Sequence, residues 1–294
     1  MPAYPEPALD RQMVVRRQLH GATILTLHRP APAPPTARPV PFGTALVEGL
    51  RDEGLIGHVL WSTDCSVADV DPAAFRTLAE AGLFLVHLDL GSDKRRACTA
   101  VQVLRHLGIL VEYDFDLAGP VQRFDTIHQN LSYLAAVVCD GSVPLLFRWS
   151  VPDGAACSPW LASYRDRLAT VIGPWLGESG LSARFGEAWA DLVVAERMLR
   201  GLTGLAAHRI ALQRLTMRSN TELVRLVSRS ADDFERYGDT TLLDTANING
   251  RCAGIGRALD QLRMSFLDAN ADALIRSGDR YDPHHDRRQL VPAS

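Results

Sequence analysis

Short apolar runs alternate with amphipathic segments through the first half of the chain. The apolar runs are typical of buried strands and occupy residues 22–28, 58–64, 83–90, 109–120 and 143–154. Between them, apolar residues recur at helical intervals in residues 42–54, 71–82, 94–108 and 124–138. Strands separated by helices of this length predict βαβ units and a parallel sheet. We expect an α/β fold with a partial parallel (β/α) barrel of about five to six strands.

The strand pattern ends near residue 158, and the rest of the chain has helical periodicity. The predicted helical segments are residues 158–177, 183–215, 221–237 and 254–275. A proline-rich stretch at 29–41 predicts an extended loop near the start of the chain. The expected organisation is therefore an N-terminal segment with the first strand and the proline-rich loop (1–41), a partial α/β barrel (42–157) and an α-helical C-terminal region (158–294).

Two ionisable residues interrupt the apolar run at 83–90. His87 and Asp89 are two positions apart, and side chains alternate across a strand, so both are expected on one face. Burying either group without a partner is costly. That face is therefore wet, internally paired or part of a site. In the internally paired alternative, His87 bonds to Asp89 or to a backbone carbonyl group.

Carboxylates also alternate along the next predicted strand, at Glu112, Asp114 and Asp116. These residues line a polar lumen, or the strand lies at an open edge and faces water. Ligands of parallel α/β sheets bind beyond the carboxyl ends of the strands. The catalytic candidates, which could supply an acid–base pair, are His87, Asp89, Glu112 and Asp114. The candidates for substrate binding are Thr63, Asp64, Asp116 and Arg148.

The composition is that of an ordinary globular chain. Its 294 residues include 31 basic and 34 acidic ones, so no overall basic field predicts binding to nucleic acid or to an anionic membrane. No apolar run reaches the roughly 18–20 residues of a membrane helix, and the first 20 residues lack the apolar core of a signal peptide. We therefore expect a cytoplasmic protein. The five cysteines show no spacing typical of a zinc or iron–sulfur site.

Three segments occur in an order that resembles the barrel region of cobalamin-type radical SAM enzymes. They are "AGLFLVHLDLGSD" (81–93), "LGILVEYDFDLAGP" (107–120) and "FRWSVPDGAACSPW" (147–160). The resemblance implies a partial barrel with SAM as a candidate ligand and with Asp89 near the SAM amino end. His87 stands where the family has glycine, and "LAGPVQ" replaces its "GlPgE" turn. The sequence has no CxxxCxxC loop, so the resemblance implies no iron–sulfur cluster and no radical chemistry by this chain alone.

These features lead to two functional hypotheses. The first is a cluster-less radical-SAM-like biosynthetic enzyme that acts on a small-molecule or carrier-bound substrate, with SAM or a divalent metal as candidate ligands. The second is a non-catalytic subunit that joins a radical SAM enzyme or carrier protein, or forms a homodimer, through its helical region. An apolar stripe around Trp189, Leu192, Met198 and Leu199 is either that interface or ordinary core.

Overall fold

The computed structural model describes residues 14–19, 22–27, 44–89, 94–116, 145–150, 166, 172–175, 180–199, 201–237 and 245–279. The strands are β1 (Val14–Leu19), β2 (Ala22–Leu27), β3 (Val59–Ser66), β4 (Leu83–Asp89), β5 (Leu110–Asp116) and β6 (Leu145–Ser150). The helices are α1 (Thr44–Asp52), α2 (Pro72–Glu80), α3 (Lys94–His106), α6 (Leu181–Met198), α7 (Leu205–Tyr237) and α8 (Thr245–Asp279), with a short 3₁₀ turn, η2, at Val67–Asp69.

The six strands form one sheet in the order in which they occur in the chain. β1 pairs with β2 in antiparallel fashion, and every later neighbouring pair from β2 to β6 is parallel. The expected α/β class, with a parallel sheet followed by a helical region, is confirmed. A barrel is not shown, because β1 and β6 are the two edges of the sheet formed by the described strands.

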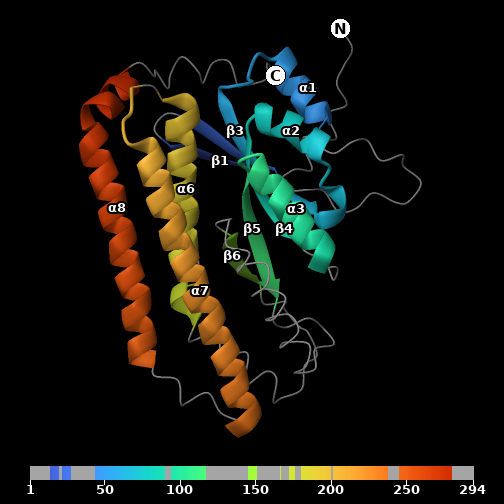
Figure 1. Cartoon of the computed structure of the whole chain (residues 1–294). Helices are drawn as coiled ribbons and strands as arrows, with labels where there is room; N and C mark the ends of the chain where they lie inside the picture. The colour runs from blue at the N-terminus through green and yellow to red at the C-terminus, as the bar shows by residue number, and fades with distance from the viewer. Residues whose placement is uncertain are drawn as a thin grey trace.

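The helices lie in two layers, one on each side of the sheet (Figure 1). From β3 onward, each strand lies next to the strand that precedes it in the chain, always on the side toward β6. When all the crossover connections have the same handedness, this order places their helices on the same face of the sheet. Accordingly, α1, α2 and α3 lie together on one side, where α2 packs on β4 and α3 packs on β5. On the other side are α6, α7 and α8, with α6 and α7 packed against β6. The C-terminal helices are therefore part of the same folded unit as the sheet.

Local capping signals determine where α2 begins and ends. Asp71 precedes the helix and accepts a hydrogen bond from the backbone N–H of Ala74 at 2.8 Å, and Pro72 occupies the first helical position. After the helix, Gly82 adopts a φ of 105°, a backbone conformation that favours glycine. The indole Nε1 of Trp61 in β3 donates to the carbonyl oxygen of Ala81 at 3.0 Å. These contacts fix the start of β4 against β3.

A continuous hydrophobic core joins the sheet to the helices on both sides. Trp61 of β3 and Phe75 of α2 belong to this core. Trp189 and Leu192 of α6 also belong to it, and each of these two has 1% of its surface exposed. The stripe proposed as a docking surface is thus interior at these two positions. Leu199 is half-buried, and the side chain of Met198 lies outside the described part of the structure. The residues of this stripe therefore do not support the partner-subunit hypothesis.

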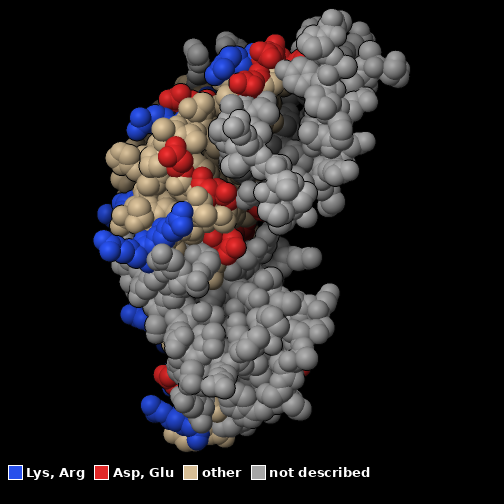
Figure 2. Space-filling model, turned by 90° about the vertical axis from the view of Figure 1, so that its right-hand side faces the viewer, with Lys and Arg blue, Asp and Glu red and all other residues tan. Residues whose placement is uncertain are grey.

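The exposed side of α1, α2 and α3 carries charges of both signs (Figure 2). The exposed residues of these helices include Glu48, Arg51, Arg76, Glu80 and Arg95. No helix in the described part of the chain combines the length and the apolar character that crossing a membrane requires.

Candidate functional site

The strand register brings three of the predicted site residues into one row. His87 in β4 is the register partner of Asp64 in β3 and of Glu112 in β5. Neighbouring residues of parallel strands that are in register point to the same face of the sheet, with strands about 4.8 Å apart. His87 therefore lies between two carboxylates on one face. All three residues were predicted from the sequence to contribute to a site.

His87 and Glu112 are in direct contact. The Nδ1 atom of His87 lies 2.7 Å from Oε2 of Glu112, and the two side chains are 11% and 19% exposed. The contact does not have the alignment of a regular hydrogen bond, so Nδ1 is held by proximity to the carboxylate and not by an ideal N–H···O geometry. The contact places a carboxylate beside Nδ1, and Nε2 is the other nitrogen of the ring.

The pair lies on the face of the sheet opposite α2 and α3. In β4, Phe84, Val86 and Leu88 are buried and form the side that these helices cover. Alternation places Leu85, His87 and Asp89 on the other side of the sheet. Leu85 and His87 are half-buried there, and Asp89 is exposed. Exposure therefore rises toward the carboxyl end of β4, which is the end at which parallel sheets bind ligands.

The remaining acidic candidates lie further toward the carboxyl ends of the strands than His87 and Glu112 do. Asp89 is the register partner of Ser66 and is exposed at the end of β4. On β5 and β6, the register pairs Asp114 with Arg148 and Asp116 with Ser150. The side chains of Asp114, Asp116 and Arg148 lie outside the described part of the structure, so their predicted roles stay predictions.

Two expectations about this region are wrong. Thr63, which was expected to bind substrate, is buried on the opposite face: its register partner is Val86, and its hydroxyl group lies 3.4 Å from the backbone oxygen of Asp64. The alternation of side chains along β3 separates Thr63 from Asp64. The internal partner suggested for His87 was Asp89 or a backbone carbonyl, whereas the structure shows Glu112.

A divalent metal was one expected use of these carboxylates. Among the residues whose side chains are described, no three His, Cys, Asp or Glu residues are grouped so that they could hold a metal ion. That set does not include Asp114 and Asp116, on which the expectation depended. His87 supplies a ring nitrogen and Glu112 supplies a carboxylate. These two groups are suited to proton transfer without a metal ion.

A second polar cluster, at the junction of α6 and α7, had no signal in the sequence. Arg209 donates from Nε to Oε1 of Glu196 at 2.8 Å and from Nη2 to Oε2, and its guanidinium group stacks 5.6 Å from the ring centre of Trp189. The hydrogen bond to Glu196 raises the pKa of Arg209. Next to it, burial lowers the pKa of His208, whose ring stacks on Phe266 with 4.4 Å between centroids. The members are paired with one another, as in a structural network.

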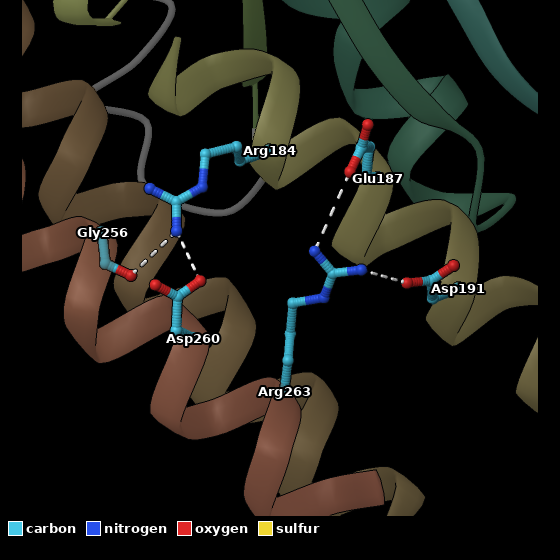
Figure 3. Close-up of polar contacts among 6 residues, drawn as sticks. All are labelled: Arg184, Glu187, Asp191, Gly256, Asp260 and Arg263. Atoms are coloured by element: carbon cyan, nitrogen blue, oxygen red, sulfur yellow. Dashed lines mark hydrogen bonds and ion pairs between the residues drawn. The ribbon is translucent and has the colours of Figure 1, made fainter. Parts of the chain in front are cut away.

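A third group of polar contacts joins α6 to α8 (Figure 3). Arg184 donates from Nη2 to Oδ1 of Asp260 and to the carbonyl oxygen of Gly256. Arg263 donates from Nη2 to Oδ2 of Asp191 at 2.7 Å, and its Nη1 atom lies 3.9 Å from Glu187. Each arginine thus crosses from one helix to a carboxylate of the other. These contacts hold α6 and α8 side by side. The best candidate for chemistry is therefore the row of Asp64, His87 and Glu112 on the sheet.

Comparison of the sequence with protein-family models, with curated proteins and with solved structures finds no match. The class of protein is therefore defined by what its own geometry shows. It is an α/β protein with a largely parallel sheet, and it has a histidine–carboxylate pair on the neighbouring parallel strands β4 and β5.

Proposed function

We propose that the chain is a small-molecule enzyme in which His87 and Glu112 form an acid–base centre. The observation that carries this proposal is the 2.7 Å contact between His87 Nδ1 and Glu112 Oε2 on neighbouring parallel strands. A half-buried imidazole beside a carboxylate is costly to maintain unless the pair is used or well satisfied. Histidine is also the side chain best suited to exchange protons near neutral pH.

The two residues have different roles in this proposal. Glu112 is the positioning residue, because its carboxylate favours the proton on Nδ1 and fixes the tautomer of the ring. Nε2 of His87 then accepts a proton from a bound substrate or returns one to it. Asp64, which is in register with His87, and Asp89, one alternation step further along β4, bind polar or cationic groups of that substrate.

The resemblance to radical SAM enzymes supports a choice of ligand and setting. In this proposal the sheet is the remaining part of such a barrel, SAM is the candidate ligand, and the setting is a biosynthetic pathway. The sequence has no CxxxCxxC loop, so the chemistry proposed for these residues is proton transfer and not radical formation.

The proposal is tested by ligand-induced thermal shift with a panel of small metabolites that includes SAM. Four proteins are compared: the unaltered chain, His87→Gln, Glu112→Gln and the control His106→Gln, which changes an exposed histidine at the end of α3. At least one compound is expected to raise the melting temperature of the unaltered and control proteins and to have no effect on the other two. Nitrogen-15 NMR is expected to show Nδ1 of His87 protonated, and a mixture of tautomers in Glu112→Gln.

Two results would overturn the proposal. One is a set of ligands that bind equally well to all four proteins. The other is the absence of any ligand, together with a loss of several degrees in melting temperature in both site variants. That combination would identify the pair as a contact that only stabilises the sheet.

A further inference from the structure

Five arginines lie along one side of α7. They are Arg214, Arg218, Arg225, Arg229 and Arg236, and they are separated by four, seven, four and seven residues. At about 100° per residue, all five fall within about 60° around the helix axis. A repeat of eleven residues corresponds to about 3.67 residues per turn, so the row stays in line along a nearly straight helix. With a rise of about 1.5 Å per residue it is about 33 Å long. We call these five residues the arginine stripe.

All five residues of the arginine stripe are exposed. The side chains of Arg225 and Arg229 are 72% and 76% exposed. Their ion pairs are loose contacts within the same helix, at 3.6 Å to Glu222 and 4.0 Å to Asp233, which contribute little to stability in water. For the other three members, no ion pair occurs within the part of the chain that the structure describes.

No member of the stripe belongs to the hydrophobic core that the described residues form. The opposite side of the helix supplies the core residues Leu212, Leu223, Val227 and Phe234. Arg209, by contrast, points inward and is bound by Glu196. The chain as a whole carries a net charge of −3, so this concentration of positive charge is a local feature. Like charges in a row repel one another, and an anionic partner would relieve that repulsion.

We propose that the arginine stripe binds an acidic surface of another protein, formed by a helix with carboxylates at matching intervals of four and seven residues. This inference concerns α7 alone and does not depend on the site at His87. Arginine is enriched in protein interfaces, and complementary charge steers partners together. Ile210, which is 50% exposed, lies beside the first arginine of the stripe and provides an apolar contact of the kind found in such interfaces.

The surroundings of the stripe favour a protein over nucleic acid or a membrane. Asp232 lies on the same side of α7 as the arginines, and Glu222 and Asp233 lie next to it, where they would repel a phosphate backbone. Mixed charges are tolerated by a protein helix, whose own basic residues can meet these carboxylates. A membrane-binding helix has a broad apolar side next to its basic residues. The exposed large apolar residues of α7 in the described part of the chain are Ile210 and Tyr237, which are too far apart to form such a side.

The test uses a helical peptide of about 26 residues with glutamates at intervals of four, seven, four and seven, labelled for fluorescence anisotropy. The control peptide has the same composition, with its glutamates distributed around the helix. The full-length chain is compared with Arg218→Gln/Arg225→Gln/Arg229→Gln. The matched control protein is Arg51→Gln/Arg76→Gln/Arg95→Gln, which removes the same charge from exposed positions on α1, α2 and α3.

The patterned peptide is expected to bind the unaltered protein at least about fivefold more tightly than the control peptide, and more weakly as salt is raised. The stripe variant is expected to lose about tenfold in affinity, and the control protein less than about twofold. Melting temperatures should stay within a few degrees, because the replaced side chains are exposed. The proposal is overturned by equal binding of the two peptides, or by an equal loss in the two variants. It is also overturned if single-stranded DNA of about 20 nucleotides or phosphatidylserine vesicles bind the stripe more tightly than the patterned peptide.

Discussion

A side chain on Gly82 would place its first carbon atom 2.3 Å from the carbonyl oxygen of Val59. Gly82 connects α2 to β4 with a φ of 105°, and its own carbonyl oxygen accepts a hydrogen bond from the N–H of Trp61 at 3.1 Å. The backbone of β4 therefore approaches β3 more closely than any residue with a Cβ atom allows. The position of the row that contains His87 depends on this approach.

Gly82→Ala is expected to destabilise the protein by about 3 kcal/mol or more, because it combines a strained φ with a contact that the rigid backbone cannot relieve. The measurement is chemical denaturation. The matched control is Gly108→Ala, in the corresponding turn between α3 and β5. Its φ is 71°, and nothing lies within 4 Å of the added carbon, so a cost of about 1 kcal/mol is expected. Equal costs at the two positions would show that the close approach to Val59 is unimportant.

The contact between Trp189 and Thr216 gives a second prediction. The indole Nε1 of Trp189 donates to Oγ1 of Thr216 at 3.1 Å, and this hydroxyl group donates to the carbonyl oxygen of Leu212 at 2.8 Å. Both side chains are fully buried. Thr216→Val leaves the indole N–H without its acceptor and is expected to cost about 1–3 kcal/mol. Thr216→Ser keeps the hydroxyl group and should cost about 1 kcal/mol for the lost methyl group.

A double-mutant cycle isolates this hydrogen bond. In a Trp189→Phe background the indole donor is absent, so Thr216→Val should cost clearly less than it does in the unaltered protein. An unchanged cost in that background would assign the effect to packing around Thr216 and not to its bond with the indole.

The same contact explains why the sequence predicted α7 incompletely. The apolar periodicity predicted helix at 183–215 and 221–237, with a gap between them, whereas α7 runs without a break from Leu205 to Tyr237. The gap contains Thr216, Ser219 and Asn220, which are all buried although polar. A buried polar residue looks like an exposed one in a hydrophobicity pattern, because the pattern does not show its hydrogen-bond partners, which for Thr216 include Trp189 of α6. The true interruption lies at residues 199–204, where Gly201 and Gly204 have positive φ.

The sheet was predicted more fully than the site. Signals close together in the sequence predicted a helix at 71–82 and strands at 58–64 and 83–90, which correspond closely to α2, β3 and β4. β1 was missed, since its pairing with β2 depends on a contact between strands and its own residues do not alternate. Alternation predicted that His87 and Asp89 share one face of their strand, and that Glu112, Asp114 and Asp116 share one face of theirs. The contact between His87 and Glu112 could not be predicted, because it requires the register between two strands whose contacting residues are 25 positions apart along the chain.

A third prediction compares the two arginines between α6 and α8. Arg263 binds Oδ2 of Asp191, and the second oxygen of this carboxylate is buried without another partner in the described structure. Arg263→Met should therefore cost about 1–2 kcal/mol, since it leaves a carboxylate that is 21% exposed without its cation. Arg184→Met affects Asp260, which is 59% exposed, and should cost less than about 0.5 kcal/mol.

Denaturation at low and high salt provides the control for this comparison. Salt screens exposed charges more strongly than buried ones. The cost of Arg184→Met should therefore disappear at high salt, while most of the cost of Arg263→Met should remain. Similar behaviour of the two variants would contradict the difference in exposure between Asp191 and Asp260.

The stacked pair of His208 and Phe266 predicts a pH dependence of stability. Burial lowers the pKa of His208, and the Glu196 carboxylate opposes this effect without cancelling it. The folded protein therefore binds a proton at this ring less readily than the unfolded chain does. As pH falls below about 6.5, the unfolded state gains protons first, so the free energy of unfolding decreases. Above about pH 7.5, the ring is neutral in both states and its contribution is constant.

The variant His208→Phe keeps an aromatic ring against Phe266 and removes the titrating group. Its free energy of unfolding is expected to decline less than that of the unaltered protein between about pH 7.5 and pH 5, and the two curves should run parallel above about pH 7.5. The measurement is urea denaturation across this range. Because the other histidines are common to both proteins, their contributions cancel in the difference between the two curves. A difference that is independent of pH would mean that the buried ring takes up a proton as easily in the folded state as in water, which contradicts the direction that burial between α7 and α8 imposes.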